Sequence, residues 1–198
     1  MDSSQVMINE AKAKYPSMDW RCADASGDLG SLGSFDIVFS NAAIQWMPDQ
    51  DRLLPKLFGM LSKGGVLAVQ VPCITYMPMR TVLEELISTE RWRGEFVDLS
   101  SSQSYHAADF YYGIFCKLTP EIDLWETDYF HIMDTHADIV KWYSGSGLRP
   151  YLDCLKTELV KAEFISEYED ALKGSYPIQP DGRVLFPFTR IFFISKKV

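Results

Sequence analysis

The sequence predicts an α/β fold built on an open, largely parallel sheet. Two short runs rich in β-branched and aromatic residues, Phe35–Ser40 and Val66–Val71, have the pattern of strands buried on both faces. Between them, a helix with an apolar face is predicted to begin at Pro48 and to end at Lys63-Gly64-Gly65. Strand, helix and strand in this order form a βαβ unit, whose two strands lie parallel in one sheet.

Two further elements are predicted before this unit. A helix begins at Ser3 or Ser4, which suit the N-cap position, and ends at Pro16. Met18–Cys22 then alternates polar and apolar residues as a short strand does. The predicted apolar face of the helix comprises Val6, Met7, Ile8, Ala11 and Tyr15.

The remainder of the chain predicts a helical cap and the last strands. Residues from about 74 to 118 are aromatic and rich in methionine, and we interpret them as a helical insertion over the sheet edge. No internal repeat or linker divides residues 1–198, so a single domain is expected. The later predicted elements are a strand over Ile122–Met133, a helix over Ala137–Tyr143, a loop over Ser144–Tyr151, a helix over Leu155–Leu172, a turn at Pro180-Asp181-Gly182 and a strand over Phe188–Ser195.

Composition narrows the class of partner. The net charge of −8 disfavours a nucleic-acid groove, which needs clustered Lys and Arg. No apolar stretch has the length of a membrane span, so no membrane partner is expected. The cysteines are far apart and form no CxxC pair, which favours reduced thiols and a cytoplasmic location. They are Cys22, Cys73, Cys116 and Cys154.

Several short motifs, each weak alone, follow one another along the chain. They are Asp2-Ser3-Ser4, Ala23-Asp24, Phe35-Asp36-Ile37-Val38-Phe39, Asn41-Ala42, Gln45-Trp46 and Gly64-Gly65-Val66-Leu67-Ala68-Val69-Gln70. In order and spacing this set resembles the class I S-adenosylmethionine-dependent methyltransferases. Within that class the chain resembles the trans-aconitate 2-methyltransferase group, through Gly147-Leu148-Arg149-Pro150-Tyr151, Tyr111-Tyr112, the strand end Asp128–His131, and Pro187 with Arg190.

The resemblance implies strands three to seven of a Rossmann-like class I sheet, with a helical insertion after strand five, and S-adenosylmethionine as cofactor. Asp2 stands at the end of the family's second strand, where a carboxylate accepts from both ribose hydroxyls. Asp24 matches the residue that accepts from the adenine amino group, with the Ala25 amide beside it. Asn41, Gln45 and Trp46 would line the passage of the methionine part and the reaction chamber.

Each assignment has an ordinary structural alternative. Asp2 suits a helix N-cap, Asp24 suits a turn, and a tryptophan such as Trp46 usually lies in a core. The spacing shared by the whole set favours descent from a methyltransferase, but it does not decide whether this chain is active.

Two elements of the family are missing from this chain: the first strand with its glycine-rich loop, and the first helix. Gly27-x-x-Gly30-x-x-Gly33 does not replace them, because it precedes a strand instead of joining strand to helix. The family's first two strands lie beside the strand that Phe35–Ser40 matches, so this strand is expected to expose an edge. We expect closure by self-association as a homodimer, by strand exchange or by rearrangement of the N-terminal elements, unless the chain is truncated from a longer gene product. Cofactor binding by the chain alone is expected to be impaired.

The resemblance implies methylation of a carboxylate on a small organic acid of the trans-aconitate kind. A carboxylate is ionised near neutral pH and needs no general base, so no catalytic residue is assigned. Arg149 is the first candidate for binding the acid, because a guanidinium holds a carboxylate bidentately, and a surface ion pair is the alternative. Tyr111, Tyr112 and Arg190 are supporting candidates.

Other interpretations remain. The three histidines are not spaced as a metal site. Cys73-Ile74 stands where the trans-aconitate group has a polar pair, which indicates that the acid methylated differs from trans-aconitate. A non-catalytic folded remnant that self-associates is the main alternative. An NAD-dependent oxidoreductase is disfavoured, because its fingerprint loop is absent from the sequence.

Overall fold

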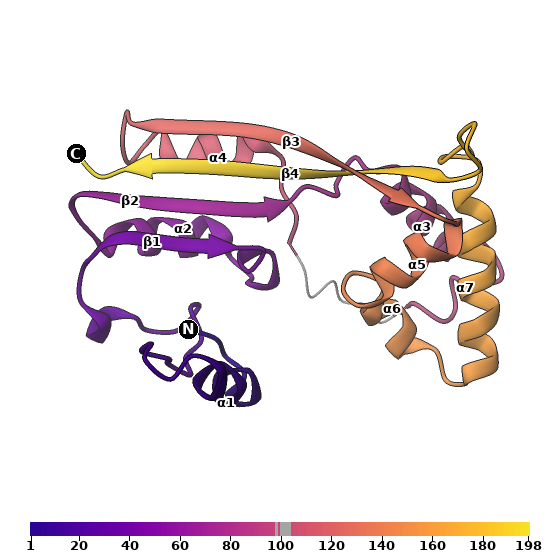
Figure 1. The fold of residues 1–198 in the computed structure, drawn as a ribbon, viewed down its shortest axis with the longest axis horizontal. Coiled ribbons are helices and arrows are strands. Elements are labelled where there is room, and N and C mark those ends of the chain that lie inside the picture. Colours follow the sequence, from indigo (N-terminus) through magenta and orange to yellow (C-terminus); the bar gives the residue numbers. More distant parts are fainter. Residues whose placement is uncertain (98, 100–103) are drawn as a thin grey trace.

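The structure, a computed structural model, describes residues 1–97, 99 and 104–198. Its sheet has four strands in the order β1-β2-β4-β3, with β1 parallel to β2 and β4 antiparallel to both of its neighbours (Figure 1). The predicted parallel pair is therefore confirmed. The strands are β1 (Phe35–Asn41), β2 (Leu61–Pro72), β3 (Ile122–Met133) and β4 (Val184–Lys196).

The helices follow the predicted order with three differences. The predicted end of the helix at Lys63-Gly64-Gly65 is wrong, because α2 ends at Gly59 and these residues lie in β2. The other two differences are at the C-terminal end. The predicted loop over Ser144–Tyr151 is wrong in its second half, where α6 begins at Arg149; Pro150 is tolerated in a first turn, where its missing N–H is not needed. The following helix begins three residues later than predicted, at Glu158, because Thr157 caps it. The helices are α1 (Gln5–Lys14), η1 (Gly30–Leu32), η2 (Ile44–Trp46), α2 (Gln50–Gly59), α3 (Pro78–Ser88), α4 (Ala108–Phe115), α5 (His136–Ser144), α6 (Arg149–Cys154) and α7 (Glu158–Leu172).

The N-terminal segment is ordered differently from the prediction. Ser4 is the N-cap of α1, as expected. The predicted strand over Met18–Cys22 is wrong, because only one residue, Asp2, lies opposite it and forms a single bridge with Cys22. The predicted apolar face of α1 is also wrong: Ile8 alone is buried, so the helix gains little from packing.

The two faces of the sheet are covered unequally. Helices α2 and α4 pack on one face, against the alternate side chains of β2 and β4 such as Val69 and Phe193. The opposite face of β1 carries Ile37 and Phe39, which are 68% and 71% exposed. No other strand among the described residues pairs with the outer edge of β1.

A second core lies at the far end of the long β3–β4 pair, where α3, α5, α6 and α7 gather (Figure 1). We call these four helices the cap. Its core contains fully buried aromatic side chains, including Phe164, Tyr168 and Phe186. In the described part of the chain, no helix is both long enough and apolar enough to cross a membrane.

Candidate functional site

The loop that follows β1 turns sharply beside the end of β2. Ala42 has a φ of 49°, an unusual left-handed conformation for a residue other than glycine. Its N–H donates to the Gln70 carbonyl at 2.9 Å, and its own carbonyl accepts from Gln45 Nε2 at 2.8 Å. The turn is thus held from both sides, at the carboxyl ends of two parallel strands, where open α/β sheets bind ligands.

Two buried amide atoms in this loop region lack a partner. Gln45 and Gln70 are only 4% and 5% exposed. Gln45 Oε1 and Gln70 Nε2 make no hydrogen bond within the described residues. A buried polar atom left in this way costs about 1–3 kcal/mol, so a polar ligand that supplies one donor and one acceptor would be stabilised here.

Gln50, in the first turn of α2, is a site residue that the sequence did not reveal. Its Nε2 donates to the carbonyls of Ile44 and Ser104 at 3.0 and 2.9 Å, and its Oε1 accepts from the Tyr111 hydroxyl at 3.2 Å. The Ser104 N–H also donates to the Gln45 carbonyl at 2.8 Å. Gln50 therefore fastens the loop after β1 to the chain at Ser104. The only sequence signal was a polar residue at a position that the helix buries.

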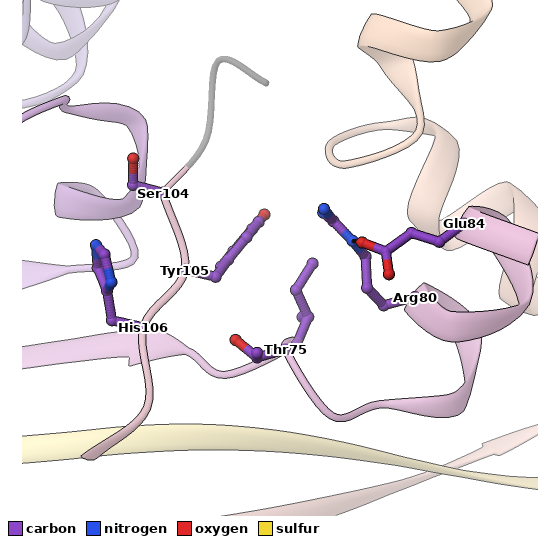
Figure 2. Close-up of a pocket in the computed structure, with 7 residues that line it drawn as sticks. Thr75, Arg80, Glu84, Ser104, Tyr105 and His106 are labelled. Carbon is purple, nitrogen blue, oxygen red and sulfur yellow. Dashed lines mark hydrogen bonds and ion pairs between the residues drawn. The ribbon is translucent and has the colours of Figure 1, made fainter. Parts of the chain in front are cut away.

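A cavity of about 310 Å³ opens between α3 and the chain around Ser104. Figure 2 shows Arg80 reaching from α3 toward Tyr105, with Glu84 beside the guanidinium. Arg80 Nε donates to Glu84 Oε1 at 2.5 Å. The described lining residues are Ile74, Thr75, Arg80, Glu84, Ser104, Tyr105 and His106.

The cavity combines a fixed positive charge with neutral hydroxyls. Burial raises the pKa of Tyr105 to about 12, although the positive charge of Arg80 opposes this shift. Burial also raises the pKa of Tyr151, which again lies within electrostatic range of Arg80. Both hydroxyls are therefore protonated donors at neutral pH. Burial lowers the pKa of His106, against the influence of Asp51, so its imidazole is mainly neutral there.

The proposed cofactor residues near the N-terminus come together. The bridge to Cys22 places Asp2 beside Ala23, whose N–H donates to the Asp2 carbonyl at 3.0 Å. Each carboxylate also closes a local turn, since Asp2 accepts from the Ser4 N–H and Asp24 from the Ser26 N–H, both at 2.8 Å. Asp24 therefore has the turn role given as its alternative, whereas the N-cap alternative for Asp2 is wrong, because Ser4 is the N-cap of α1. Ala25 is buried beside Asp24.

The remaining predicted cofactor residues lie around the loop after β1. Gln45 is buried there, whereas Asn41 and Trp46 are exposed. Trp46 is therefore not a core residue. The three positions lie at one strand end, as the family resemblance implies.

The proposed substrate residues are dispersed. The side chain of Arg149 is 75% exposed and lies 3.8 Å from Asp153, the surface pairing considered as its alternative. Tyr111 is buried against Phe193 and Tyr112 is exposed. Arg190 alone reaches the strand ends, where its Nη1 donates to Gln70 Oε1 at 3.0 Å. None of these four is among the described residues that line the cavity.

Comparisons with known proteins agree with this architecture. Residues 1–69 match a family described as a methyltransferase domain. The trans-aconitate 2-methyltransferase of Methylobacterium radiotolerans is 35% identical, over 100% of this chain and 76% of that protein. The enzyme of the same name from Azoarcus sp. is 34% identical, over 98% of this chain and 76% of that protein. A candidate methyltransferase from Bacillus halodurans has a TM-score of 0.61 at 16% identity, covering 99% of this chain and 80% of that one, which confirms the predicted fold class.

Proposed function

Because the chain belongs to the trans-aconitate 2-methyltransferase family of S-adenosylmethionine-dependent methyltransferases, we propose that it methylates a carboxylate of a small organic acid. The observation that carries this proposal is the position of the cavity. Ser104 lines it and is hydrogen-bonded to Gln45, whose buried Oε1 makes no hydrogen bond to the described residues near the end of β1. A polar ligand at the strand ends and an acid in the cavity would therefore be neighbours.

The residues at the strand ends fit the cofactor chemically. Gln70 Nε2 can donate to the carboxylate of its amino-acid part, and Gln45 Oε1 can accept from the ammonium group. Asp2 retains acceptor capacity for the ribose hydroxyls, and Asp24 lies near it for the adenine amino group. Asn41 and Trp46 complete this side of the proposed site.

The protein's contribution to the reaction is positioning. When bound, S-adenosylmethionine supplies a methyl group on a positively charged sulfur, and the carboxylate oxygen takes this methyl as the carbon–sulfur bond breaks with its electron pair left on sulfur. The acid is ionised near neutral pH, so no side chain has to remove a proton. Arg80 and Tyr105 hold the acid, and fixing the reacting atoms in line lowers the barrier.

We further propose that this chain alone binds the cofactor weakly. Asp2 and Asn41 are both exposed, and the edge of β1 beside them is unpaired within the described residues. Small-molecule sites normally bury most of the ligand surface, whereas water would reach the cofactor from this side. We also propose a cytoplasmic location, which the four cysteines support because none of them forms a disulfide.

A second candidate is a non-catalytic protein that self-associates through β1. The exposed side chains of Ile37 and Phe39 favour it, because an apolar unpaired strand is a template for pairing with a second copy. Phe39→Lys should then reduce the dimer fraction in light scattering. A compact monomer at high concentration would exclude this candidate.

Methyl transfer is tested with S-adenosylmethionine labelled in its methyl group and trans-aconitate as acceptor. We expect labelled product from which base releases the label, because base hydrolyses a methyl ester. Calorimetry with S-adenosylmethionine separates the two candidates. Absence of both binding and transfer, in a protein that scatters as a dimer, would favour the non-catalytic candidate.

A further inference from the structure

Arg80 is held in place by tyrosines from the distant C-terminal part of the chain. The preceding residue, Met79, is fully buried. Its N–H donates to the Tyr176 hydroxyl at 3.0 Å, and its carbonyl accepts from the Tyr168 hydroxyl at 2.9 Å. The first turn of α3 is therefore fixed against α7 and the residues that follow it, and the backbone that carries Arg80 is fixed with it.

The guanidinium retains donors for a ligand. Its side chain is 22% exposed, and its ion pair with Glu84 is made through Nε. A guanidinium has five N–H donors in a planar fork, so both terminal nitrogens can still meet a carboxylate. Figure 2 shows the terminal nitrogens on the side of Tyr105, with Glu84 on the other side of the group.

Neutral hydroxyls surround this cation. Tyr105, Tyr143 and Tyr151 lie within electrostatic range of Arg80. The Tyr143 hydroxyl is buried beside the guanidinium and supports it from behind, outside the described lining of the cavity. A cation with neighbouring hydroxyl donors recognises an anion that has several acceptor oxygens, which is the chemistry of a carboxylate.

The opposite wall of the cavity adjoins the loop after β1, where methyl transfer is proposed to take place. Ser104 and His106 form part of it, and Ser104 is bonded to both Gln45 and Gln50. An acid bound to Arg80 at one end would thus present its other end to the loop after β1.

We propose that Arg80, with Tyr105, binds a carboxylate of the acid other than the one that is methylated, and so discriminates acids with at least two carboxylates from acids with one. This inference rests on the proposed function and assigns a specificity residue to it. Glu84 acts as a positioning residue, because it fixes the orientation of the guanidinium plane.

Calorimetry without cofactor tests the subsite by binding alone. The probes are trans-aconitate, which has three carboxylates, and crotonate, which has a similar unsaturated chain and one. We expect trans-aconitate to bind at least about tenfold more tightly, and Arg80→Gln to weaken its binding by about 10- to 100-fold, as for loss of a charged hydrogen-bond partner. Arg80→Lys, which keeps the charge but loses the fork, should lose less.

Arg183→Gln is the matched control, since Arg183 is an exposed arginine paired with Asp181 outside the cavity. Tyr105→Phe removes a hydroxyl from the facing wall, and we expect it to weaken trans-aconitate binding by about 3- to 10-fold. This variant tests the proposal if Arg80→Gln does not fold. Equal binding of the two acids, no binding of either, or unchanged binding after the substitution that folds would overturn the proposal.

Labelled methyl transfer separates this inference from the proposed function. If the parent protein methylates both acids equally and Arg80→Gln does the same, the subsite is wrong and the methyltransferase proposal stands. If trans-aconitate binding depends on Arg80 but no methyl group is transferred, the subsite stands and the proposed function fails.

Discussion

The cap and the β1 side of the sheet differ in how far they bury the aromatic side chains of their strands. In the cap, Phe186 is fully buried among Trp142, Tyr176 and Phe188, and tyrosine hydroxyls pair with the backbone of Met79. On β1, Phe39 lies in a strand of similar composition but is 71% exposed. Both regions use aromatic residues on strands, yet only the cap encloses them.

This difference separates the two halves of the proposed site. The acid side, at Arg80, is built on a closed core whose hydrogen bonds fix the residue in advance. The cofactor side, at Asp2 and Asn41, adjoins an open edge and exposed residues. A preorganised site loses less conformational entropy on binding. Binding of the acid at Arg80 should therefore depend little on the order of the cofactor side. Four predictions test this comparison.

The largest change in stability is expected from truncating a phenylalanine of the cap, compared with the same truncation on β1. Phe186→Ala should lower the free energy of unfolding by about 3–5 kcal/mol, because it leaves a cavity in the cap. Phe39→Ala should change it by no more than about 0.5 kcal/mol, because that side chain is exposed. Urea unfolding measures both. Similar losses for the two variants would show that β1 is covered in solution.

Gly147 tests the packing of the tyrosines behind Arg80. A Cβ added at Gly147 would lie 2.1 Å from Cε2 of the buried Tyr143 ring. Gly147→Ala should therefore destabilise the protein by about 1–3 kcal/mol and weaken trans-aconitate binding. At Gly145 the nearest atom is 3.8 Å away, so Gly145→Ala is the control. Equal stability of both variants would contradict this packing.

Lys56 tests the cofactor side. Its Nζ donates to the carbonyls of Ala25 and Ser26, both at 3.3 Å, and so ties the loop that carries Asp24 to α2. Lys56→Met should cost about 0.5–1 kcal/mol of local stability. Amide hydrogen exchange should accelerate in this loop and stay unchanged in the cap. Unchanged exchange around Asp24 would mean that the loop is held by other contacts.

A further prediction concerns alkaline pH. Burial raises the pKa of Tyr105 and of Tyr176 to about 12, whereas an unfolded tyrosine titrates near about 10. Above about pH 10 the unfolded state releases these protons and the folded state retains them, so stability is present below that pH and falls as pH rises toward about 12. Tyrosinate absorbance should therefore complete its rise together with the loss of circular dichroism. Complete ionisation in a folded protein would disprove the burial.

The prediction of the sheet from sequence succeeded where a pattern was local. Phe35–Ser40 and Val66–Val71 are runs whose composition indicates buried strands, and both form strands. The predicted burial is confirmed for the second run only, because one face of β1 is uncovered and leaves Ile37 and Phe39 exposed. Met18–Cys22 has a strand-like alternation but pairs at one residue, because a strand needs a partner that local sequence does not reveal. The start of α6 was missed because a Gly-Leu-Arg-Pro sequence resembles a loop.

The site was predicted less completely than the fold. Arg149 lies in a recognisable motif, in which Gly147 makes room for a tyrosine ring and Leu148 is fully buried. Packing thus explains part of that motif. Arg80 has no motif of its own, and Gln50 is one polar residue in an amphipathic helix, so neither could be singled out.

By itself, the sequence determined the family and the parallel strands, because composition and motif order are local properties of the chain. The tertiary structure decided which polar groups meet. The Met79–Tyr176 hydrogen bond spans 97 positions and the Gln50–Ser104 bond spans 54. Such contacts depend on how segments far apart in the sequence pack together, since buried polar groups must find partners wherever the fold brings them.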